Sequence, residues 1–385
     1  MRDLLEIRNE IDTIDQEIVR LYEERMKKAE QVADYKIRTG KSVYDPVREK
    51  EKLDSLSAMA STPFNGCGIR ELFQQIMSGS RKRQYQLLSE HGIMEPFGFN
   101  LMDEIDMSSG KVVFQGAQGA YTQQAVMSFF GMNCDSYHVD TWREAMEAIS
   151  NGDAAFAVLP IENSSAGAVS ENYDLLVEYD NTIVGEQIIQ IRHALLGTED
   201  ATMEDIKEVY SHPQALMQCE QYLKGHSNWG QLRVLNTAIA AMKIRDDKDK
   251  THAAIAGVGN AKIYGLKILE DSIQDNKENY TRFIVVSHRH VYTPKSNKIS
   301  ICFEAPHESG SLYHMLSHFI YNNLNMSSIQ SRPIREEAWE YRFFVDFEGN
   351  LEDSAVQNAL RGLKEEATSL KILGNYPSEN SNGWR

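Results

Sequence analysis

The stretch AAFAVLPIENSSAGAVSEN, residues 154–172, passes from an apolar run directly into a cluster of polar side chains. The run over residues 154–159 predicts a buried strand that ends at Pro160. A carboxylate, an amide and a hydroxyl follow at once in Glu162, Asn163 and Ser164. Open α/β sheets bind ligands just beyond the carboxyl ends of their strands, so the cluster indicates a binding site. A capped turn would explain the stretch equally well.

Strands and helices alternate on both sides of this stretch, which predicts an α/β domain over residues 111–290. Four further stretches place polar groups at strand ends: FQGAQGAYTQQAV (114–126), SHPQALMQC (211–219), AAIAGVGNAKIYGL (253–266) and NYTRFIVV (279–286). The sequence GAQGAY matches neither the dinucleotide-binding fingerprint nor the P-loop, so nucleotide binding is not expected.

The first 90 residues contain no strand-like run. Apolar residues three and four positions apart predict one long amphipathic helix over 4–38, formed around Leu4, Ile7, Ile11, Ile14, Ile18 and Leu21. The sequence Asp45-Pro46 predicts the start of a second helix that runs to about residue 61. The sequence GCG at 66–68 leads into a third, which ends near residue 88.

The rest of the chain divides into a linker and a C-terminal domain. Residues 91–110 contain Pro, Gly, Asn and Ser without a clear period, as expected of a linker. Strands over 299–303, 326–331, 341–347 and 370–373 and helices over 310–322 and 354–367 give a βαββαβ order, which is ferredoxin-like α+β. This domain is expected over 296–385.

Composition excludes several classes of protein. The 385 residues are 42% hydrophobic and 25% charged, and the net charge of −16 argues against a nucleic-acid partner. The charged N-terminus does not resemble a signal peptide, and no apolar run has membrane-spanning length. The cysteines lie far apart, which argues against a metal site or a disulfide framework and favours the cytoplasm: Cys67, Cys134, Cys219 and Cys302.

Polar residues interrupt the apolar faces of the first and third helices. Arg25 and Lys36 lie eleven residues apart, which is close to three turns, so both share the face expected to be buried. Ser80 and Gln84 do the same on the third helix. Such residues form a pocket for a small dianion, or their stems extend to solvent. Arg8 lies about 25 Å from Arg25 along the helix, so if it also contacts a ligand it serves the pocket of another subunit.

The segments LLEIRNEID, ERMKKAEQVADYK, YDPVREKE and LFQQIMSGSRKRQ resemble the all-helical chorismate mutases, which are intertwined dimers, across residues 4–88. The resemblance implies that Lys36 and Gln84 donate to the ether oxygen of chorismate and that Glu49 accepts from its ring hydroxyl. It implies substrate contacts from Arg8, Arg25, Asp45, Arg48 and Ser80, although Asp45 also suits a helix cap. No cofactor is implied, because the rearrangement is intramolecular.

The motifs PIENS, SHPQAL and NYTRF, in this order, resemble prephenate dehydratase across residues 111–290. The resemblance implies Thr281 as proton donor, catalytic roles for Glu162 and Asn163, and a cleft between lobes at about 111–190 plus 265–290 and 191–264. The implied substrate-binding residues are Ser164, Ser211, His212, Gln214 and Arg282. His212 could instead cap a helix, and Arg282 could pair with a substrate carboxylate or with Glu162.

Together these resemblances imply a bifunctional chorismate mutase–prephenate dehydratase of phenylalanine biosynthesis, as a homodimer or homotetramer. Prephenate dehydratases have a bilobal plan similar to that of periplasmic solute-binding proteins, which leaves a non-catalytic ligand-binding module as an alternative. A dehydratase that prefers arogenate is another alternative, although fusion to a mutase that makes prephenate argues against it.

The C-terminal segment resembles an ACT regulatory domain, which implies phenylalanine as an allosteric inhibitor. The sequence departs from the usual motifs, with GSLY at 310–313 for GALV and QSRP at 330–333 for ESRP. Effector-binding positions carried over by the resemblance are Gly310, Ser311, Leu312, Gln330, Ser331, Arg332 and Pro333. Gln330 keeps an acceptor oxygen but lacks the charge of glutamate, so weaker binding of an ammonium group is expected.

Overall fold

The computed structural model describes residues 3–95, 97–334 and 340–379, and the chain falls into two compact units. The first unit comprises Met1–Phe97 and Ile301–Lys371, and the second comprises Gly98–Ser300 and Ile372–Arg385. Residues 380–385 of the expected C-terminal domain lie outside the described part. Across the described residues, no helix is both long and apolar enough to cross a membrane.

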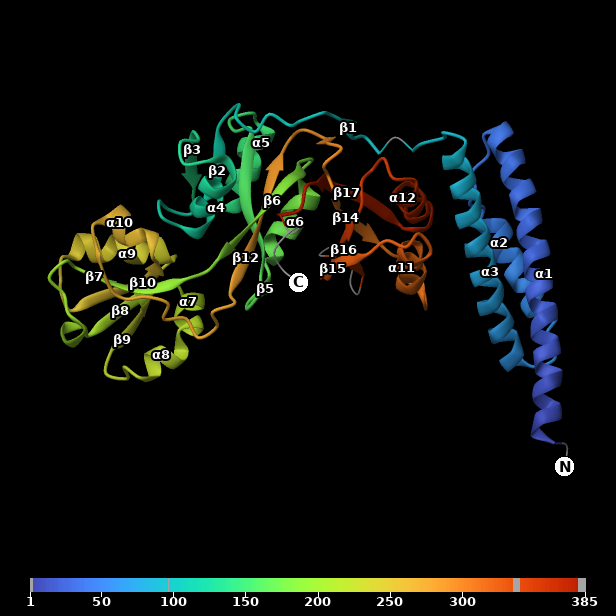
Figure 1. The fold of residues 1–385 in the computed structure, drawn as a ribbon, viewed down its shortest axis with the longest axis horizontal. Helices are drawn as coiled ribbons and strands as arrows, with labels where there is room; N and C mark the ends of the chain where they lie inside the picture. The colour runs from blue at the N-terminus through green and yellow to red at the C-terminus, as the bar shows by residue number, and fades with distance from the viewer. Residues whose placement is uncertain (1–2, 96, 335–339, 380–385) are drawn as a thin grey trace. The chain divides into compact units, whose positions relative to one another are not determined.

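Three helices open the first unit (Figure 1): α1 Leu4–Thr39, α2 Pro46–Ser57 and α3 Pro63–Glu90. Gly40 ends α1 in the left-handed conformation, at φ 66°, which a glycine adopts without steric cost. The predicted start of α3 was wrong, because the GCG sequence lies inside the helix. Thr62 accepts a hydrogen bond from the Asn65 N–H at 3.2 Å and Pro63 occupies the first helical position, so the helix starts there.

A mixed sheet forms one lobe of the second unit, in the order β3-β2-β4-β12-β6, with β5 paired to β4. Its core includes Phe114, Phe156 and Phe283. The elements are β2 Val112–Gln115, α4 Tyr121–Phe130, β3 Ser136–Val139, α5 Trp142–Ser150, β4 Phe156–Asn163, β5 Gly167–Ala168, α6 Ser170–Glu178, β6 Thr182–Gln190 and β12 Tyr280–Ser287.

A second sheet, in the order β11-β7-β10-β8-β9, forms the other lobe. Its elements are β7 His193–Gly197, η1 Met203–Asp205, β8 Glu208–Ser211, α7 Pro213–Gln218, α8 Glu220–Lys224, β9 Gly230–Arg233, α9 Thr237–Asp247, β10 His252–Gly257, α10 Gly259–Tyr264 and β11 Lys267–Glu270. Residues 265–290 were expected with the first lobe, but β11 pairs with β7. The chain therefore returns to the first sheet only after residue 270.

The opening stretch forms a longer strand than its apolar run predicts. β4 continues past Pro160 to Asn163, so Glu162 and Asn163 lie within the strand rather than beyond it. The register against β12 shifts between Arg282 and Phe283, which leaves Ile161 as an extra residue. Proline lacks an N–H and is tolerated at such an irregularity, so Pro160 does not end the strand.

The predicted linker also contains a strand. β1 Asn100–Leu101 pairs in parallel with β13 Val291–Tyr292, so the segment after the helices is tied to the second unit. The linker predicted over residues 91–110 therefore contains a short strand. Two residues give the sequence too little length to show a strand period.

The C-terminal sheet has the order β15-β16-β14-β17 and follows the predicted βαββαβ succession. Its elements are β14 Lys298–Glu304, α11 Ser311–Tyr321, β15 Met326–Pro333, β16 Tyr341–Glu348, α12 Ser354–Glu366 and β17 Ser369–Tyr376. The boundary between the units passes through β14 and β17. Within the first unit, α12 packs against α3, so the helical segment and the C-terminal segment share an interface.

Candidate active sites

The first candidate site lies between α1 and α3. Arg25 of α1 donates to the Ser80 hydroxyl at 2.5 Å and to the Ile76 carbonyl at 3.5 Å. Gln84, one turn beyond Ser80, donates to the Ser80 carbonyl at 3.2 Å. Its buried Oε1 has no hydrogen-bond partner in the described part of the chain. Partial burial lowers the pKa of Arg25.

Lys36 and the start of α2 form the next part of this site. The Lys36 ammonium donates to the Val43 carbonyl at 2.6 Å. Burial lowers the pKa of Lys36, and the charges of Glu365, Asp45 and Glu49 oppose that shift. The sequence Asp45-Pro46 begins α2 as predicted, and the Asp45 carboxylate accepts from the Arg48 N–H at 3.1 Å. Asp45 therefore acts as a helix cap, whereas the Arg48 side chain is exposed.

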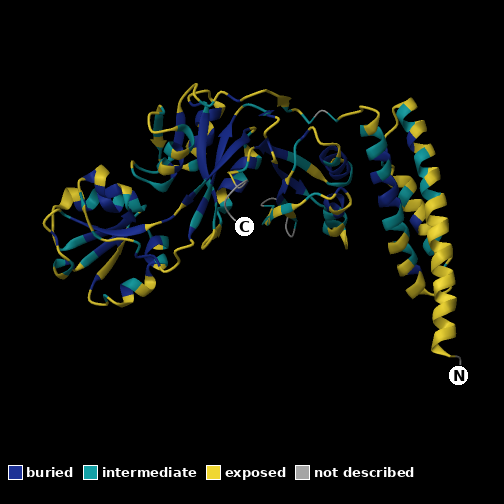
Figure 2. Ribbon diagram, viewed as in Figure 1, coloured by how far each residue is buried: buried dark blue, intermediate teal, exposed yellow. Residues whose placement is uncertain are grey.

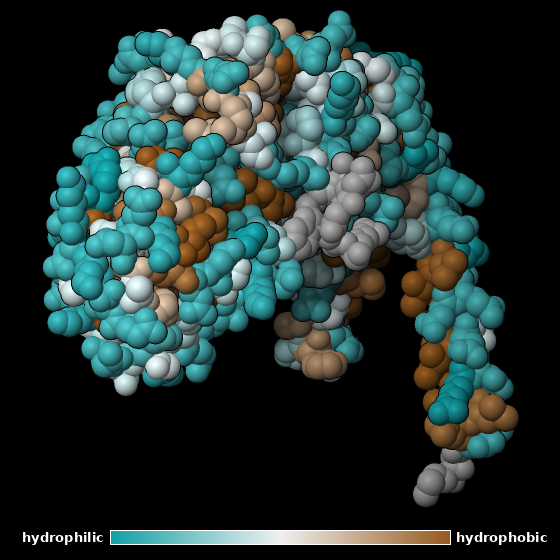
Figure 3. Space-filling view, turned by 60° about the vertical axis from the view of Figure 1, so that its left-hand side comes forward, coloured by the Kyte–Doolittle hydropathy of each residue, from teal (hydrophilic) through white to brown (hydrophobic). Residues whose placement is uncertain are grey.

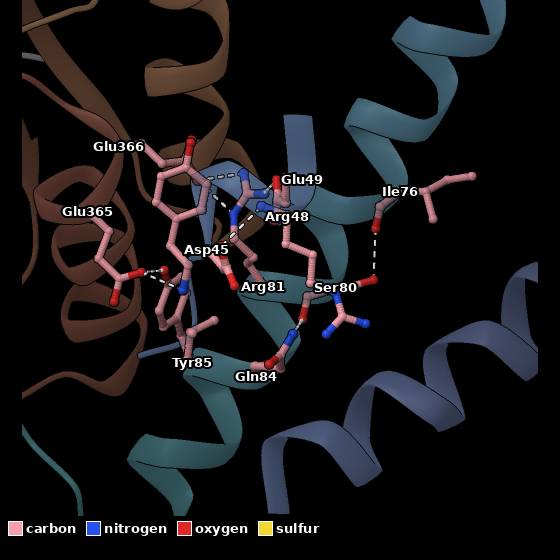
Figure 4. Close-up of polar contacts among 12 residues, drawn as sticks. Asp45, Arg48, Glu49, Ile76, Ser80, Arg81, Gln84, Tyr85, Glu365 and Glu366 are labelled. Carbon is pink, nitrogen blue, oxygen red and sulfur yellow. Dashed lines mark hydrogen bonds and ion pairs between the residues drawn. The ribbon is translucent and has the colours of Figure 1, made fainter. Parts of the chain in front are cut away.

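Glu49 has a charged neighbour that sequence reasoning missed. Its carboxylate is ion-paired with Arg81, which directly follows Ser80 on α3 (Figure 4). Arg81 also donates to Glu366 of α12, at 3.0 Å through Nε and 2.7 Å through Nη2. Position 81 lies one residue past the polar face of Ser80 and Gln84, so helical spacing alone gave no reason to select it.

Arg8 does not join this cluster. It lies on the exposed N-terminal half of α1, and Figure 2 shows that half as exposed. The apolar residues of the predicted stripe are also exposed there, and Figure 3 shows the apolar surface that they form. The exposed fractions are 60% for Leu4, 37% for Ile7, 50% for Ile11, 59% for Ile14, 49% for Ile18 and 51% for Leu21. Within this chain, the predicted stripe is therefore not buried over that half of α1.

The second candidate site lies on neighbouring strands of the first lobe. Asn163 of β4 pairs in register with Thr281 of β12, and its side-chain amide donates to the Thr281 hydroxyl oxygen at 2.9 Å. The same amide donates to Asn279 Oδ1 at 2.8 Å. Thr281 is only 8% exposed. The strand register therefore places one hydroxyl and one amide together, as the NYTRF and PIENS motifs imply.

Glu162 and Arg282 lie on the other face of the same two strands. Successive side chains of a strand alternate in direction, and these two residues are also paired in register. Arg282 lies 3.5 Å from Glu162 and 3.5 Å from the fully buried carboxylate of Glu186. Of the two roles left open for Arg282, the structure has the pairing with Glu162. It does not bring Glu162 to the Thr281 hydroxyl.

Glu186 is a buried acid that the sequence analysis missed. Lys298 donates to both of its oxygens, at 2.7 and 2.9 Å. An acid within the otherwise apolar run TIVGEQII was the available signal, because a buried charge requires a partner. This pairing explains how a carboxylate stays within the lobe.

The second-lobe residues mainly support their own fold. Ser211 donates to the Ile255 carbonyl at 2.6 Å and is fully buried. His212 caps α7 and accepts from the Gln214 N–H at 3.2 Å, which fits the capping alternative. Burial lowers the pKa of His212. Ser164, in the first lobe, accepts from the Tyr280 N–H at 2.9 Å.

The loop after β2 forms hydrogen bonds with the second lobe. Asn260 of α10 donates to the Gly119 carbonyl at 3.0 Å, and Tyr264 donates to the Gln118 carbonyl at 2.5 Å. A side chain at Gly119 would collide with Asn260, since a Cβ there would lie 2.1 Å from its oxygen. Tyr121 donates to the Arg192 carbonyl at 2.7 Å. The glycines therefore permit close contact between lobes.

The predicted effector residues lie in two places, at the start of α11 and on β15. Gly310 has φ 83°, and an open cavity of about 350 Å³ beside it is lined by residues that include Ser311, Leu312, Tyr341 and Phe343. Tyr313 is 56% exposed and does not line this cavity. Gln330, Ser331, Arg332 and Pro333 lie on β15, at one end of the sheet.

Two polar sites lie on separate folds, one among helices and one on paired strands, as in an enzyme with two active sites. A model of the chorismate mutase type II family matches residues 7–85, and a model of the prephenate dehydratase family matches residues 112–291. A bifunctional chorismate mutase/prephenate dehydratase from Aquifex aeolicus is 32% identical over 381 residues, which cover 98% of each chain. The chain belongs to the family of bifunctional chorismate mutase/prephenate dehydratases.

Two further relatives bear on the substrate and the effector. Arogenate dehydratase 2 of Petunia hybrida is 34% identical over 378 residues, which cover 87% of this chain and 95% of that one. A prephenate dehydratase from Arthrobacter aurescens, crystallised in complex with L-Phe, has a TM-score of 0.65 and 30% identity. That comparison covers 69% of this chain and 90% of the other.

Proposed function

We propose that the helical site rearranges chorismate to prephenate and that the strand site converts prephenate to phenylpyruvate. The observation that carries this proposal is the coincidence of each family match with one polar site: residues 7–85 contain the Arg25 cluster, and residues 112–291 contain the pair Asn163 and Thr281. The test is to supply the protein with chorismate alone. Accumulation of phenylpyruvate supports both steps, and prephenate as the end product refutes the second.

In the mutase reaction the protein binds and orients one molecule. Arg25, together with the other arginines of the site, binds the carboxylates of chorismate and stabilises its compact conformer. Lys36 and Gln84 donate hydrogen bonds to the ether oxygen, where negative charge develops as the C–O bond breaks and the new C–C bond forms. Glu49 accepts from the ring hydroxyl. Asp45, Arg48 and Ser80 complete the substrate contacts.

In the dehydratase reaction one hydroxyl delivers a proton. The C–C bond to the ring carboxylate breaks and releases CO₂, the electron pair aromatises the ring, and the ring C–O bond breaks. The hydroxyl leaves as water with the proton of Thr281, and the alkoxide then takes a proton from solvent. Because Asn163 donates to the Thr281 oxygen, it stabilises negative charge there and leaves the hydroxyl proton free for the substrate.

The residues around Thr281 hold the substrate and support the strands. We assign Ser164, His212 and Gln214 to the walls of the cleft between the lobes, and the fully buried Ser211 to the support of that wall. Glu162 and Arg282 act as an ion pair on the face opposite Thr281. The cleft is tested by Gln214→Ala, which should raise KM for prephenate more than it lowers kcat. An unchanged KM would remove Gln214 from the substrate site.

The exposed apolar face of α1 has a second copy of this chain as its partner. Arg8 lies on that half of the helix, about 25 Å along the axis from Arg25, so one small substrate does not reach both within one chain. Two antiparallel α1 helices would bury the apolar faces and bring Arg8 of one subunit to the Arg25 cluster of the other. The assembly is therefore an intertwined homodimer, or a homotetramer built from it.

We assign the C-terminal βαββαβ segment as an ACT domain that binds phenylalanine and inhibits the dehydratase. Gly310 permits close backbone approach to a ligand carboxylate, and Leu312 lines a cavity large enough for a small ligand. Strand β15 is at the edge of its sheet, so a second copy pairing there would bring Gln330 to the cavity. The Arthrobacter relative, crystallised with L-Phe, supports this choice of effector.

Arogenate is the second candidate substrate for the strand site, because the Petunia relative bears that name. Prephenate and arogenate differ in a keto and an amino group on the side chain. Measuring kcat/KM for both with one preparation decides between them. Fusion to a mutase that makes prephenate favours prephenate. A higher kcat/KM for arogenate than for prephenate would refute that assignment.

A further inference from the structure

Arg81 is shared by two carboxylates from different segments of the first unit. One is Glu49 of α2, within the mutase cluster, and the other is Glu366 at the end of α12, in the C-terminal segment. The side chains of Arg81 and Glu366 are each only 8% exposed. The Arg81 guanidinium also lies 4.9 Å from the centre of the Tyr44 ring. Figure 4 shows Arg81 between the two acids.

Arg81 is one cation between two carboxylates, so Glu49 and Glu366 share its charge. Burial raises the pKa of Glu366, but hydrogen bonds and charge interactions with His318 and Arg81 outweigh it and lower the pKa to about 2. His318 Nε2 lies 3.3 Å from Glu366 Oε1. Glu366 is therefore an anion at neutral pH, and it competes with Glu49 for one guanidinium. Glu49 in turn interacts electrostatically with Arg25, Lys36, Tyr44 and Arg81.

We propose that Arg81 and Glu366 are positioning residues for the mutase reaction: Glu366 anchors Arg81 through two of its N–H groups, and Arg81 holds the Glu49 carboxylate toward the substrate. This inference rests on the proposed mutase function. Without Glu366, Arg81 is free to form a two-point pair with Glu49, which takes up the oxygens needed by the ring hydroxyl. Helix α12 of the C-terminal domain thereby becomes part of the mutase site.

The test compares full-length variants for chorismate turnover, with prephenate turnover by the same preparations as the control for folding. Glu366→Gln should lower the mutase kcat about tenfold and change KM much less, because the Glu49 contact acts on the transition state. Lys364→Gln is the matched control, since Lys364 lies on the same helix and pairs with Glu95 rather than with Arg81. It should leave both activities within about twofold of wild type.

A second pair of variants separates positioning from general support of the interface. Arg81→Met removes the cation that lies between Glu49 and Glu366, so it should shift the acidic limb of the mutase pH profile to higher pH. Adding Glu366→Gln to Arg81→Met removes one of the two acids and should return that limb toward its original position. The Glu366 change would then harm the wild-type background and help the Arg81→Met background.

Several results would overturn the proposal. An unchanged kcat and pH profile in Glu366→Gln would show that Glu366 does not act on the site. Equal losses in both backgrounds would show that it acts without Arg81. If Glu366→Gln fails to fold, Glu366→Asp replaces it, and an unchanged mutase kcat in that variant would overturn the proposal as well. Failure of the wild type to convert chorismate would instead refute the mutase function itself.

Discussion

The two sites of this chain are built in opposite ways. The mutase cluster collects charged side chains from α1, α2 and α3 and holds them through hydrogen bonds and ion pairs, one of which extends to Glu366 of α12. The strand site depends on backbone register, which sets Asn163 beside Thr281 and leaves charged residues on the other face. The mutase reaction needs charge arranged around one molecule, whereas the dehydratase reaction needs one proton at one place.

This difference predicts how each site fails. The strand site should lose nearly all activity when its donor hydroxyl is removed, because no neighbouring group replaces that proton. In the helical site several cations contribute to catalysis, so each single substitution there should lower the activity by a smaller factor. Separate assays with chorismate and prephenate can therefore break or sharpen the comparison.

The largest effect is expected for Thr281→Ala. Loss of the proton donor should lower kcat with prephenate about 10³-fold, so that prephenate accumulates from chorismate. Thr281→Ser retains the hydroxyl and should keep part of the activity. Steady-state assays with prephenate measure both. Phenylpyruvate formation by Thr281→Ala within a few-fold of wild type would exclude Thr281 as the donor. The strand site would then tolerate a single substitution as well as the helical site does.

Lys36→Ala should give the next largest effect. Removing one donor to the ether oxygen should lower the mutase kcat about 10²-fold, while turnover of added prephenate stays near the wild-type value. Chorismate consumption, followed directly, gives the first quantity. Lys27→Ala is a control, because Lys27 is an exposed cation of the same helix. Near-normal chorismate consumption by Lys36→Ala would sink the assignment.

Much of both sites could be predicted from the sequence, because motifs preserve residue type and spacing. Helical spacing placed Arg25 with Lys36 on one helix and Ser80 with Gln84 on another, and the structure joins them through Arg25 and Ser80. The motifs placed Asn163 with Thr281. Arg81 and Glu366 could not be predicted, because their pairing joins residues 285 positions apart and depends on how α12 packs on α3. Position along the sequence carries no signal for such a contact.

The sequence also could not show which side chains of β4 and β12 share a face of the sheet. The motif PIENS does not show that β4 continues past Pro160, and the register shift against β12 decides which side chains share a face. Glu162 and Arg282 were therefore expected near the donor hydroxyl, but alternation places them on the opposite face. A single extra residue at Ile161 accounts for this difference.

Mixing two inactive variants tests whether the helical site crosses subunits, whereas Asn163 and Thr281 of the strand site meet within one chain. An Arg8→Ala chain and a Lys36→Ala chain should complement when they are refolded together, because one site of the hybrid inherits both intact residues. Random pairing predicts recovery to about one quarter of wild-type mutase activity. Sedimentation and a second affinity tag verify the hybrid. No recovery in verified heterodimers would place Arg8 within its own chain or outside the site.

The smallest effect is expected at the effector site, where one charge separates Gln330 from the usual glutamate. Gln330 keeps an acceptor oxygen for the ammonium group of phenylalanine but lacks the charge. A charged hydrogen bond contributes about 1.5–3 kcal/mol and a neutral one about 0.5–1.5 kcal/mol, so the difference corresponds to roughly five- to tenfold in affinity. Gln330→Glu should therefore bind phenylalanine more tightly by this factor and be inhibited at lower concentration.

Calorimetry on both proteins decides this last point. Gln330→Met is the matched control, because it keeps the length of the side chain, removes the acceptor and should weaken binding further. Equal affinities for wild type and Gln330→Glu would remove the charge argument. An absence of binding to all three would mean that the C-terminal domain serves assembly alone. Its link to catalysis would then be structural, through contacts such as that of Glu366 with Arg81, rather than through an effector.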